Sequence, residues 1–279
     1  MAKTPKRNKL KQLTLSPTVT ERLPTARVAN LIDVAMPAAP ACDSDGDMQA
    51  SDIHHEPLCI TESLEDWKSP EAHSGMNGLL VKRPLEWGWD AHARAIDAAQ
   101  ARFSVGAVLS SRFSVGIGSP ALRAAVRMLL TTAALPAPIS EQIELDVEKI
   151  VPAVAAMCPS ARSLELKLEI IGENTCSRWH QDNFMGRALV SYTGSGTMYT
   201  SDGNVDFWEL QHCGNNDCII GDASKVESVD VGDILFIKGK KYGRGSPALV
   251  HKAPPKRYHE DGRIVNRLVM KVDVHSKAA

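Results

Sequence analysis

The chain has 279 residues, 43% of them hydrophobic, and a formal net charge of -1 at pH 7. This is enough for one large or two small domains with a hydrophobic core. The balanced charge gives no basic field for nucleic acid or for an acidic membrane surface, so the expected substrate is a small molecule or another protein. No apolar run approaches the roughly 20 residues that span a bilayer, and no secretory-type apolar stretch occurs near residue 1, so we expect an intracellular protein.

Residues 1–56 are predicted to be a disordered basic arm followed by an acidic linker. Lys and Arg dominate the first thirty residues, with Glu21 as their only acidic residue, and Asp dominates residues 31–50. A segment with this charge and little apolar periodicity does not bury a core. We expect the cytoplasm as the location, with an organelle or the nucleus as alternatives because of the basic run at residues 6–11.

Residues 57–160 are predicted to be mainly helical, after a short strand at 78–81. Helices are expected over 91–103, over 121–135 and after Ser140. Ser119 and Pro120 precede the second of these as a cap and a first-turn proline. The third has one apolar face, with Pro152 as a predicted kink. That face consists of Ile143, Val147, Ile150, Val151 and Val154.

Residues 161–275 change to the period of two that is typical of strands. The clearest case is 163–170, and turn residues separate the other predicted strands. These are expected over 188–192, 197–200, 205–210, 233–238, 249–251 and 265–274. The sequence therefore predicts an α+β chain in which a helical region packs, as one unit, with an antiparallel sandwich or barrel.

His180 and Asp182 are the first candidate metal ligands. Residues two apart in a strand point to the same side, so this pair can present an imidazole nitrogen and a carboxylate oxygen to one ion. His251, which ends a distant apolar run, is the predicted third ligand. Two histidines and one carboxylate leave open positions for substrate and oxygen, as non-haem Fe(II) oxygenases require.

Spacing alone does not identify this site, because His259 and Asp261 repeat it. That second pair lies among prolines and charged residues in a predicted hairpin loop, where we expect it to be solvated. The run His54-His55-Glu56 lies at the edge of the linker and is expected to have no role in the site.

Four further residues are candidates for binding a co-substrate. Arg267 could hold the far carboxylate of a dicarboxylic acid as a bidentate pair, with Lys271 on the same strand face as its substitute. This requires that their face of the strand, and not the face of Leu268, borders the site. Tyr192 and Thr197 are expected to shape the pocket.

Cys213 and Cys218, with His212 beside them, lie in a polar loop. They could bind a metal or form a small disulfide, although their spacing is unlike that of common zinc sites. The six cysteines are scattered through a mid-sized chain, which favours reduced thiols.

Co-linear blocks of the sequence resemble a known family. They are residues 176–182, 187–197, 232–239, 249–255 and 266–268. Over roughly residues 57–274 the chain resembles the domain of unknown function family 1826, which in turn is similar to the Fe(II)/2-oxoglutarate-dependent dioxygenases.

This resemblance implies a double-stranded β-helix, also called a jelly roll, with an HxD…H…R motif. By position, His180, Asp182 and His251 would bind iron, and Arg267 would bind 2-oxoglutarate. The interval between Asp182 and His251 is longer than in compact members, with the excess expected in 202–223.

The function expected from the residues and the resemblance together is that of an Fe(II)/2-oxoglutarate-dependent dioxygenase. Two alternatives are a non-redox metal-binding or metal-homeostasis protein that uses zinc, and a degenerate jelly roll that serves as an interaction module. In the last case the three ligands would not converge.

Overall fold

A computed structural model describes residues 56–69, 73–83, 106, 108–172, 176–243 and 247–276. The predicted arm and linker, apart from Glu56, and the helix predicted over 91–103 lie outside the described residues. Within the described ranges, no helix combines the length and the apolar character needed to cross a membrane.

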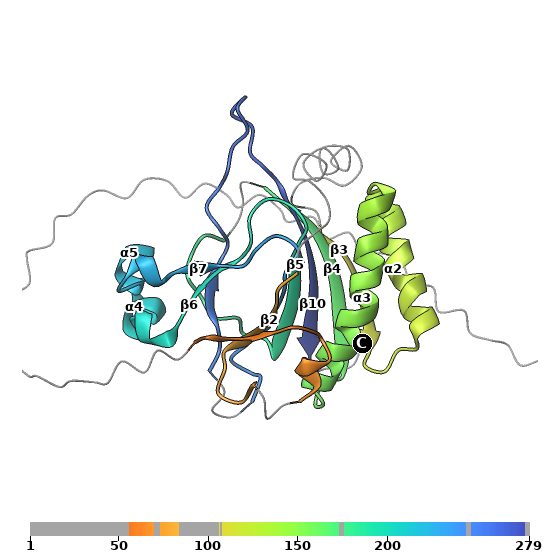
Figure 1. The fold of residues 1–279 in the computed structure, drawn as a ribbon, viewed down its shortest axis with the longest axis horizontal. Helices are drawn as coiled ribbons and strands as arrows, with labels where there is room; N and C mark the ends of the chain where they lie inside the picture. The colour runs from red at the N-terminus through yellow and green to blue at the C-terminus, as the bar shows by residue number, and fades with distance from the viewer. Residues whose placement is uncertain are drawn as a thin grey trace, which may run out of the picture.

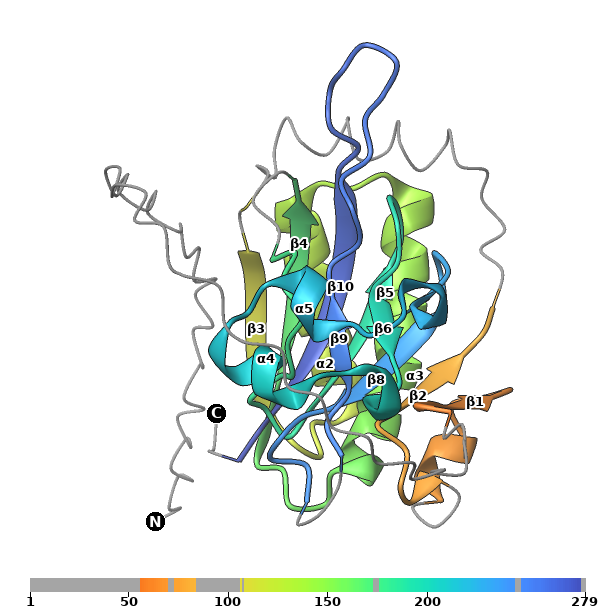
Figure 2. The same ribbon diagram turned by 90° about the vertical axis from the view of Figure 1, so that its left-hand side faces the viewer.

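The described residues form layers around a central sheet (Figures 1 and 2). This main sheet has seven described strands in the order β1-β2-β8-β5-β10-β4-β3. Their bounds are β1 Leu58–Thr61, β2 Gly78–Val81, β3 Val108–Ser114, β4 Ser163–Ile171, β5 Gly186–Ser191, β8 Ile234–Lys238 and β10 Arg267–His275. Helices α2 and α3 cover one face, and a small sheet lies over the other (Figure 1).

The small sheet has the order β7-β6-β9. Its strands are β6 Met198–Thr200, β7 Glu227–Ser228 and β9 Val250–Lys252. Its outer side carries two short helices, α4 Phe207–His212 and α5 Asn216–Ile219.

The main sheet is mixed, so the prediction of a wholly antiparallel fold is wrong at one edge. β1 and β2 pair in parallel, with Leu58 opposite Gly78, whereas the other pairs within the described residues are antiparallel. Parallel neighbours need a long crossover, which the segment between β1 and β2, with its short 3-10 helix Asp66–Lys68, supplies. β1, β2 and β3 also share this sheet with the strands after residue 160.

The two predicted helices that fall within the described residues are confirmed. α2 runs Ser119–Ala133 and α3 runs Ala137–Met157, continuing through Pro152. Ser119 is the first helical residue and not the cap, because Gly118 has the extended N-cap conformation and no side chain caps the end.

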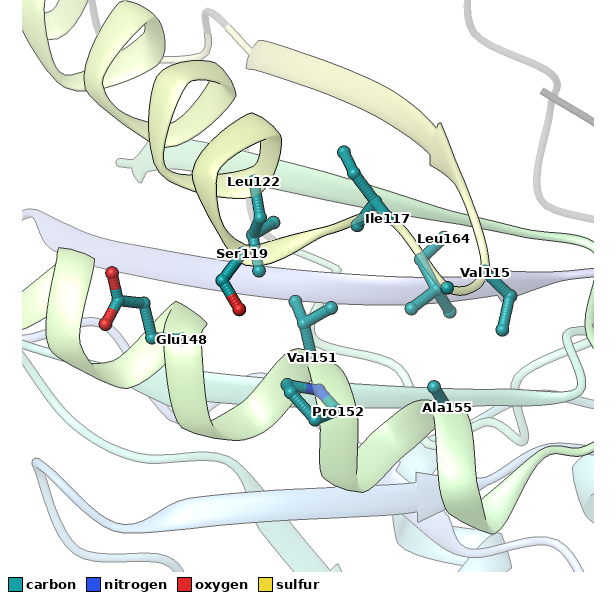
Figure 3. A pocket seen from close by; sticks show the side chains of 10 residues that line it. Val115, Ile117, Ser119, Leu122, Glu148, Val151, Pro152, Ala155 and Leu164 are labelled. Carbon is teal, nitrogen blue, oxygen red and sulfur yellow. The ribbon is translucent and has the colours of Figure 1, made fainter.

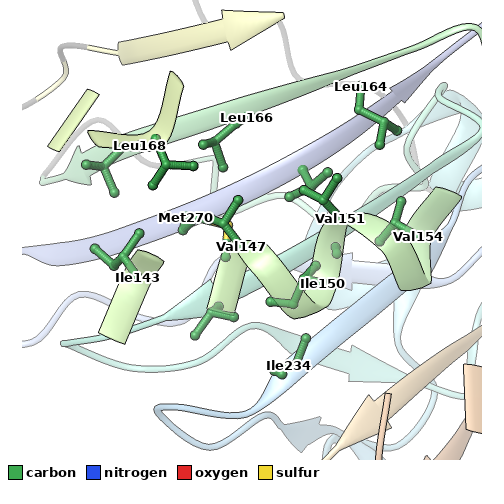
Figure 4. Packing of buried hydrophobic residues seen from close by; sticks show 14 of the residues in the cluster. Ile143, Val147, Ile150, Val151, Val154, Leu164, Leu166, Leu168, Ile234 and Met270 are labelled. Carbon is green, nitrogen blue, oxygen red and sulfur yellow. The ribbon is translucent and has the colours of Figure 1, made fainter. Parts of the chain in front are cut away.

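The predicted apolar face of α3 is buried against the sheet (Figure 4). On β10 the side chains of Leu268, Met270, Val272 and Val274 join this core. A second core lies between the sheets and includes Leu189, Leu235, Tyr199 and Leu249. Both faces of the main sheet are therefore covered, and the alternate residues of β10, beginning with Arg267, face the space between the sheets.

The strand predicted over 205–210 is wrong, because α4 begins at Phe207. Asp206 is its N-cap and accepts a hydrogen bond from the Glu209 amide at 2.9 Å. Such a cap stabilises a first turn that a short apolar pattern does not distinguish from a strand. Phe207 and Leu210 pack against Trp179 and Val250, so the predicted excess after Asp202 forms an extra layer on the small sheet.

Asp146 of α3 joins the helix layer to the main sheet. Its carboxylate accepts both terminal nitrogens of Arg83 at 2.5 Å and the hydroxyl of Tyr192 at 2.6 Å. The Arg83 amide in turn donates to Asp233 at 2.8 Å. Removal of a fully bonded buried carboxylate leaves its cationic partner without compensation.

We therefore expect Asp146→Ala to lower the free energy of unfolding by about 3 kcal/mol. The matched control is Glu148→Ala on the same helix, whose partner Arg123 is half exposed and whose loss should cost less than about 1 kcal/mol. Urea unfolding of both variants measures the difference, and equal losses would contradict this role for Asp146.

Candidate metal centre

His180 and His251 lie directly opposite each other on paired backbones. The amide of each donates to the carbonyl of the other at 3.0 Å, which extends the small sheet beyond β9 by one antiparallel bridge. Side chains at such a position point to the same face, and the two imidazole centroids are 4.4 Å apart. Asp182, two residues after His180, shares that face.

The structure brings the three predicted ligands together. Nε2 of His180 lies 3.8 Å from Oδ1 of Asp182, and Nε2 of His251 lies 3.9 Å from Oδ2. One ligand atom from each residue lies within 4.8 Å of the other two. Donors separated in this way can share one ion at bond lengths of roughly 2.0–2.2 Å.

Both histidines present the nitrogen that a metal needs. Nδ1 of His180 is bonded to the carbonyl of Arg178 at 2.8 Å, and Nδ1 of His251 to that of Leu249 at 3.0 Å. A carbonyl only accepts, so each Nδ1 is the donor and each Nε2 keeps its lone pair. Burial lowers the pKa of His251 to about 4 despite the opposing effect of Asp182, and the ring is therefore neutral at pH 7.

Asp182 is positioned by a buried charge network that spans the main sheet. Arg187 of β5 donates to Oδ2 of Asp182 at 3.0 Å. The same guanidinium donates to both oxygens of Asp273 on β10, at 2.5 and 3.2 Å, and Lys167 of β4 donates to Asp273 at 2.8 Å. These contacts follow from the register, in which Asp273 lies opposite Arg187.

The Asp273 carboxylate remains ionised in this network. Burial alone would raise its pKa, but Arg187 and Lys167 outweigh burial and hold the pKa at about 2. Because the folded value lies below the usual aspartate value, ionised Asp273 stabilises the fold above about pH 4, and this contribution is lost as the pH falls toward 2.

We expect the stability advantage of the natural chain over Asp273→Asn to depend on pH. The difference in free energy of unfolding should narrow by about 1 kcal/mol between about pH 5 and pH 3, since protonation removes what the substitution has already removed. Urea titrations at both pH values measure this. Parallel stability curves for the two proteins would show that Asp273 does not titrate with the fold.

Arg267 lies on the side of β10 that faces the small sheet, which the anchor prediction requires. Its side chain is 8% exposed, and Nη2 donates to Ser191 at 3.1 Å. Gly194, with φ of +83°, lies so close that a Cβ there would be 2.3 Å from Cγ of Arg267. Lys271 shares this face but is already paired with Glu169 at 2.9 Å.

Tyr192 is placed on the other side of the main sheet. It is completely buried in the core beneath the helices, and its hydroxyl donates to Asp146. The expectation that Tyr192 shapes the pocket is therefore corrected: strand alternation directs it away from the triad and into the contact with α3.

Thr197 and Tyr199 belong to the small sheet beside His251. Tyr199 is the direct cross-strand partner of His251, and Thr197 precedes it by two residues on the same face. The Tyr199 hydroxyl donates to Glu227 at 2.8 Å. Sequence analysis missed Tyr199, because only the register between β6 and β9 reveals that it neighbours a ligand.

The second His-x-Asp pair does not form a site. His259 and Asp261 lie in a hairpin tip, in which Asp261 pairs with the neighbouring Arg263. This agrees with the expected solvated loop. His54 and His55 fall outside the described residues.

A cavity of about 370 Å³ lies elsewhere, between α2, α3 and the end of β4 (Figure 3). Its lining is mostly apolar and includes Leu122, Val151 and Leu164. Because these residues belong to the helix side of the main sheet, the cavity is separated from the triad by the sheet itself.

A family model described as "Protein of unknown function (DUF1826)" matches residues 69–273. The chain belongs to this family. The predicted family resemblance is thus confirmed, and a search of curated proteins finds no match.

Several solved structures are similar in shape. The dioxygenase for auxin oxidation 1 from Arabidopsis thaliana, in complex with 2-oxoglutarate, has a TM-score of 0.43 and 11% identity, over 78% of this chain and 91% of that one. A full-length Neurospora crassa protein in complex with alpha-KG has 0.35 and 11%, over 78% and 84%. A Pseudomonas putida prolyl-4-hydroxylase has 0.35 and 11%, over 76% and 98%. With identities and scores this low, the function is argued below from the side chains of the site.

Proposed function

We propose that the chain is an Fe(II)/2-oxoglutarate-dependent dioxygenase whose metal ligands are His180, Asp182 and His251. The observation that carries the proposal is that two Nε2 atoms and one carboxylate converge from paired backbone segments. Two imidazoles and a carboxylate on one face of an ion are the donor set of non-haem Fe(II) oxygenases, and they leave positions for other ligands. The convergence is not what a degenerate jelly roll predicts.

Arg267 supports a dicarboxylic co-substrate. It forms no ion pair with Asp or Glu in the described part of the chain, and its Nε is buried without a hydrogen-bond partner. Burial lowers the pKa of Arg267 to about 10, with only partial compensation by Glu169. A buried guanidinium in this state gains most from a ligand carboxylate, whereas the ammonium of Lys271 is already neutralised.

In the proposed reaction the bound iron allows dioxygen to oxidise 2-oxoglutarate and the substrate together. One oxygen atom enters succinate, carbon dioxide leaves, and the other oxygen atom converts a substrate C–H bond into C–OH. The chain's own contribution is to hold two neutral imidazoles and one ionised carboxylate in place. Arg187 orients Asp182, and Arg267 binds the far carboxylate of the co-substrate.

The proposed ligand role of His251 predicts a sharp contrast between two histidines. His251→Ala should weaken Fe(II) or Mn(II) binding by at least about 100-fold, because a ligand and not an outer partner is lost. His259→Ala is the matched control and should leave the affinity unchanged, since that side chain lies in the hairpin tip. Calorimetric titration of both folded variants measures this, and equal affinities would refute the triad.

The role of 2-oxoglutarate is tested with the anaerobic Fe(II) protein. We expect a visible metal-to-ligand charge-transfer band when 2-oxoglutarate is added, and Arg267→Ala should weaken co-substrate binding by about 10- to 100-fold, as loss of a charge-assisted pair implies. Lys271→Ala should have a smaller effect because its partner is Glu169. Absence of the band together with tight zinc binding would favour the non-redox alternative.

A further inference from the structure

A second group of metal-binding side chains lies in the layer formed by α4 and α5. Glu209 and Cys213 are four residues apart and therefore share one face of α4 and its C-terminal turn. The chain then reverses and brings Cys218 of α5 back to them. One carboxylate oxygen of Glu209 and the two sulfur atoms lie within 4.8 Å of one another.

The turn that joins these ligands is held tightly by the backbone. The amides of Cys213 and Gly214 both donate to the carbonyl of Glu209, at 3.1 and 2.9 Å. Gly214 has φ of +67°, and a Cβ there would lie 1.5 Å from the guanidinium of Arg178. Glycine therefore permits both the left-handed turn and the close approach of Arg178.

The group lacks a compensating partner. Oε2 of Glu209 is buried and has no hydrogen-bond partner among the described residues, which calls for an explanation such as an ion. Both cysteines are free thiols and exposed to solvent. Partial desolvation, together with Cys213 and Glu209, raises the pKa of Cys218. Three groups that all become negative on ionisation repel one another unless a cation lies between them.

We propose that Glu209, Cys213 and Cys218 bind a soft divalent cation of the zinc class, at a site separate from the His180 triad. Two thiolates and one carboxylate supply three tetrahedral positions, and water completes the fourth. Thiolates favour zinc over the hard cations that carboxylates and carbonyls bind. The inference stands whether or not the triad binds iron.

The site would stabilise the layer that supports His180. Asn216 of α5 accepts a hydrogen bond from the Trp179 amide at 3.0 Å and donates to the Ser177 carbonyl at 2.8 Å. Trp179 also packs with Ile219 and Val250. A cation that joins α4 to α5 thus fixes the helical layer against the segment that precedes His180, and the role of the site is structural.

Cobalt(II) titration of the reduced, full-length chain under anaerobic conditions tests this. Thiolate-to-cobalt charge-transfer absorption arises from cysteine ligands alone, so ions bound by the triad do not contribute to it. We expect one equivalent of cobalt to produce the band and zinc to abolish it by displacement. Glu209→Gln should weaken this binding by at least about 10-fold.

Two controls distinguish the site from other thiols and from the triad. Cys213→Ser combined with Cys218→Ser should remove the band, whereas Cys176→Ser, at another exposed cysteine, should retain it. His180→Ala should also retain it. Circular dichroism confirms that each variant folds. No band in the reduced natural chain, or a band that persists in the double variant, would overturn the proposal.

Discussion

The pair of backbone hydrogen bonds between His180 and His251 is the constraint on which the candidate centre depends. It aligns two segments that are distant in sequence and places both imidazoles on one face. The two-residue period of an extended chain then adds Asp182. A shift of this register by one residue would turn His251 toward Trp179 and separate the ligands. The layers of the fold, from α2 and α3 on one side to α4 and α5 on the other, support this pairing from both sides.

Electrostatics completes what the register begins. Asp182 is held by Arg187, which is held in turn by Asp273 and thereby connected to Lys167. The carboxylate of the triad is thus positioned by a network rooted in the central strands of the main sheet, where movement is least. Arg267, on the same strand as Asp273, has no such carboxylate partner among the described residues. This difference between two buried arginines distinguishes a structural pair from a group available to a ligand.

Local pattern in the sequence predicted those parts of the fold that local physics determines. Residues 163–170 alternate because one face meets the helices, and the apolar face of α3 follows the helical period. The HxD spacing similarly needs only an extended chain to bring His180 and Asp182 together. By contrast, residues 205–210 have an apolar pattern compatible with either state, and the capping by Asp206 decided for a helix.

Long-range register accounts for the features that the sequence did not reveal. Alternation placed Arg267 and Leu268 on opposite faces, but both faces of the main sheet are buried, so polarity did not identify the side of the site. For the same reason Tyr192 was assigned to the pocket, whereas Tyr199 lies beside His251. The partnership of Arg187 with Asp273 likewise depends on the pairing of β5 with β10.

X-ray absorption at the iron edge of the anaerobic Fe(II) protein tests the central claim most directly. The account predicts a first shell of nitrogen and oxygen only, with the multiple-scattering pattern of two imidazoles, and loss of one imidazole in His251→Ala. A shell that contains sulfur, or an imidazole count unchanged by that substitution, would contradict it.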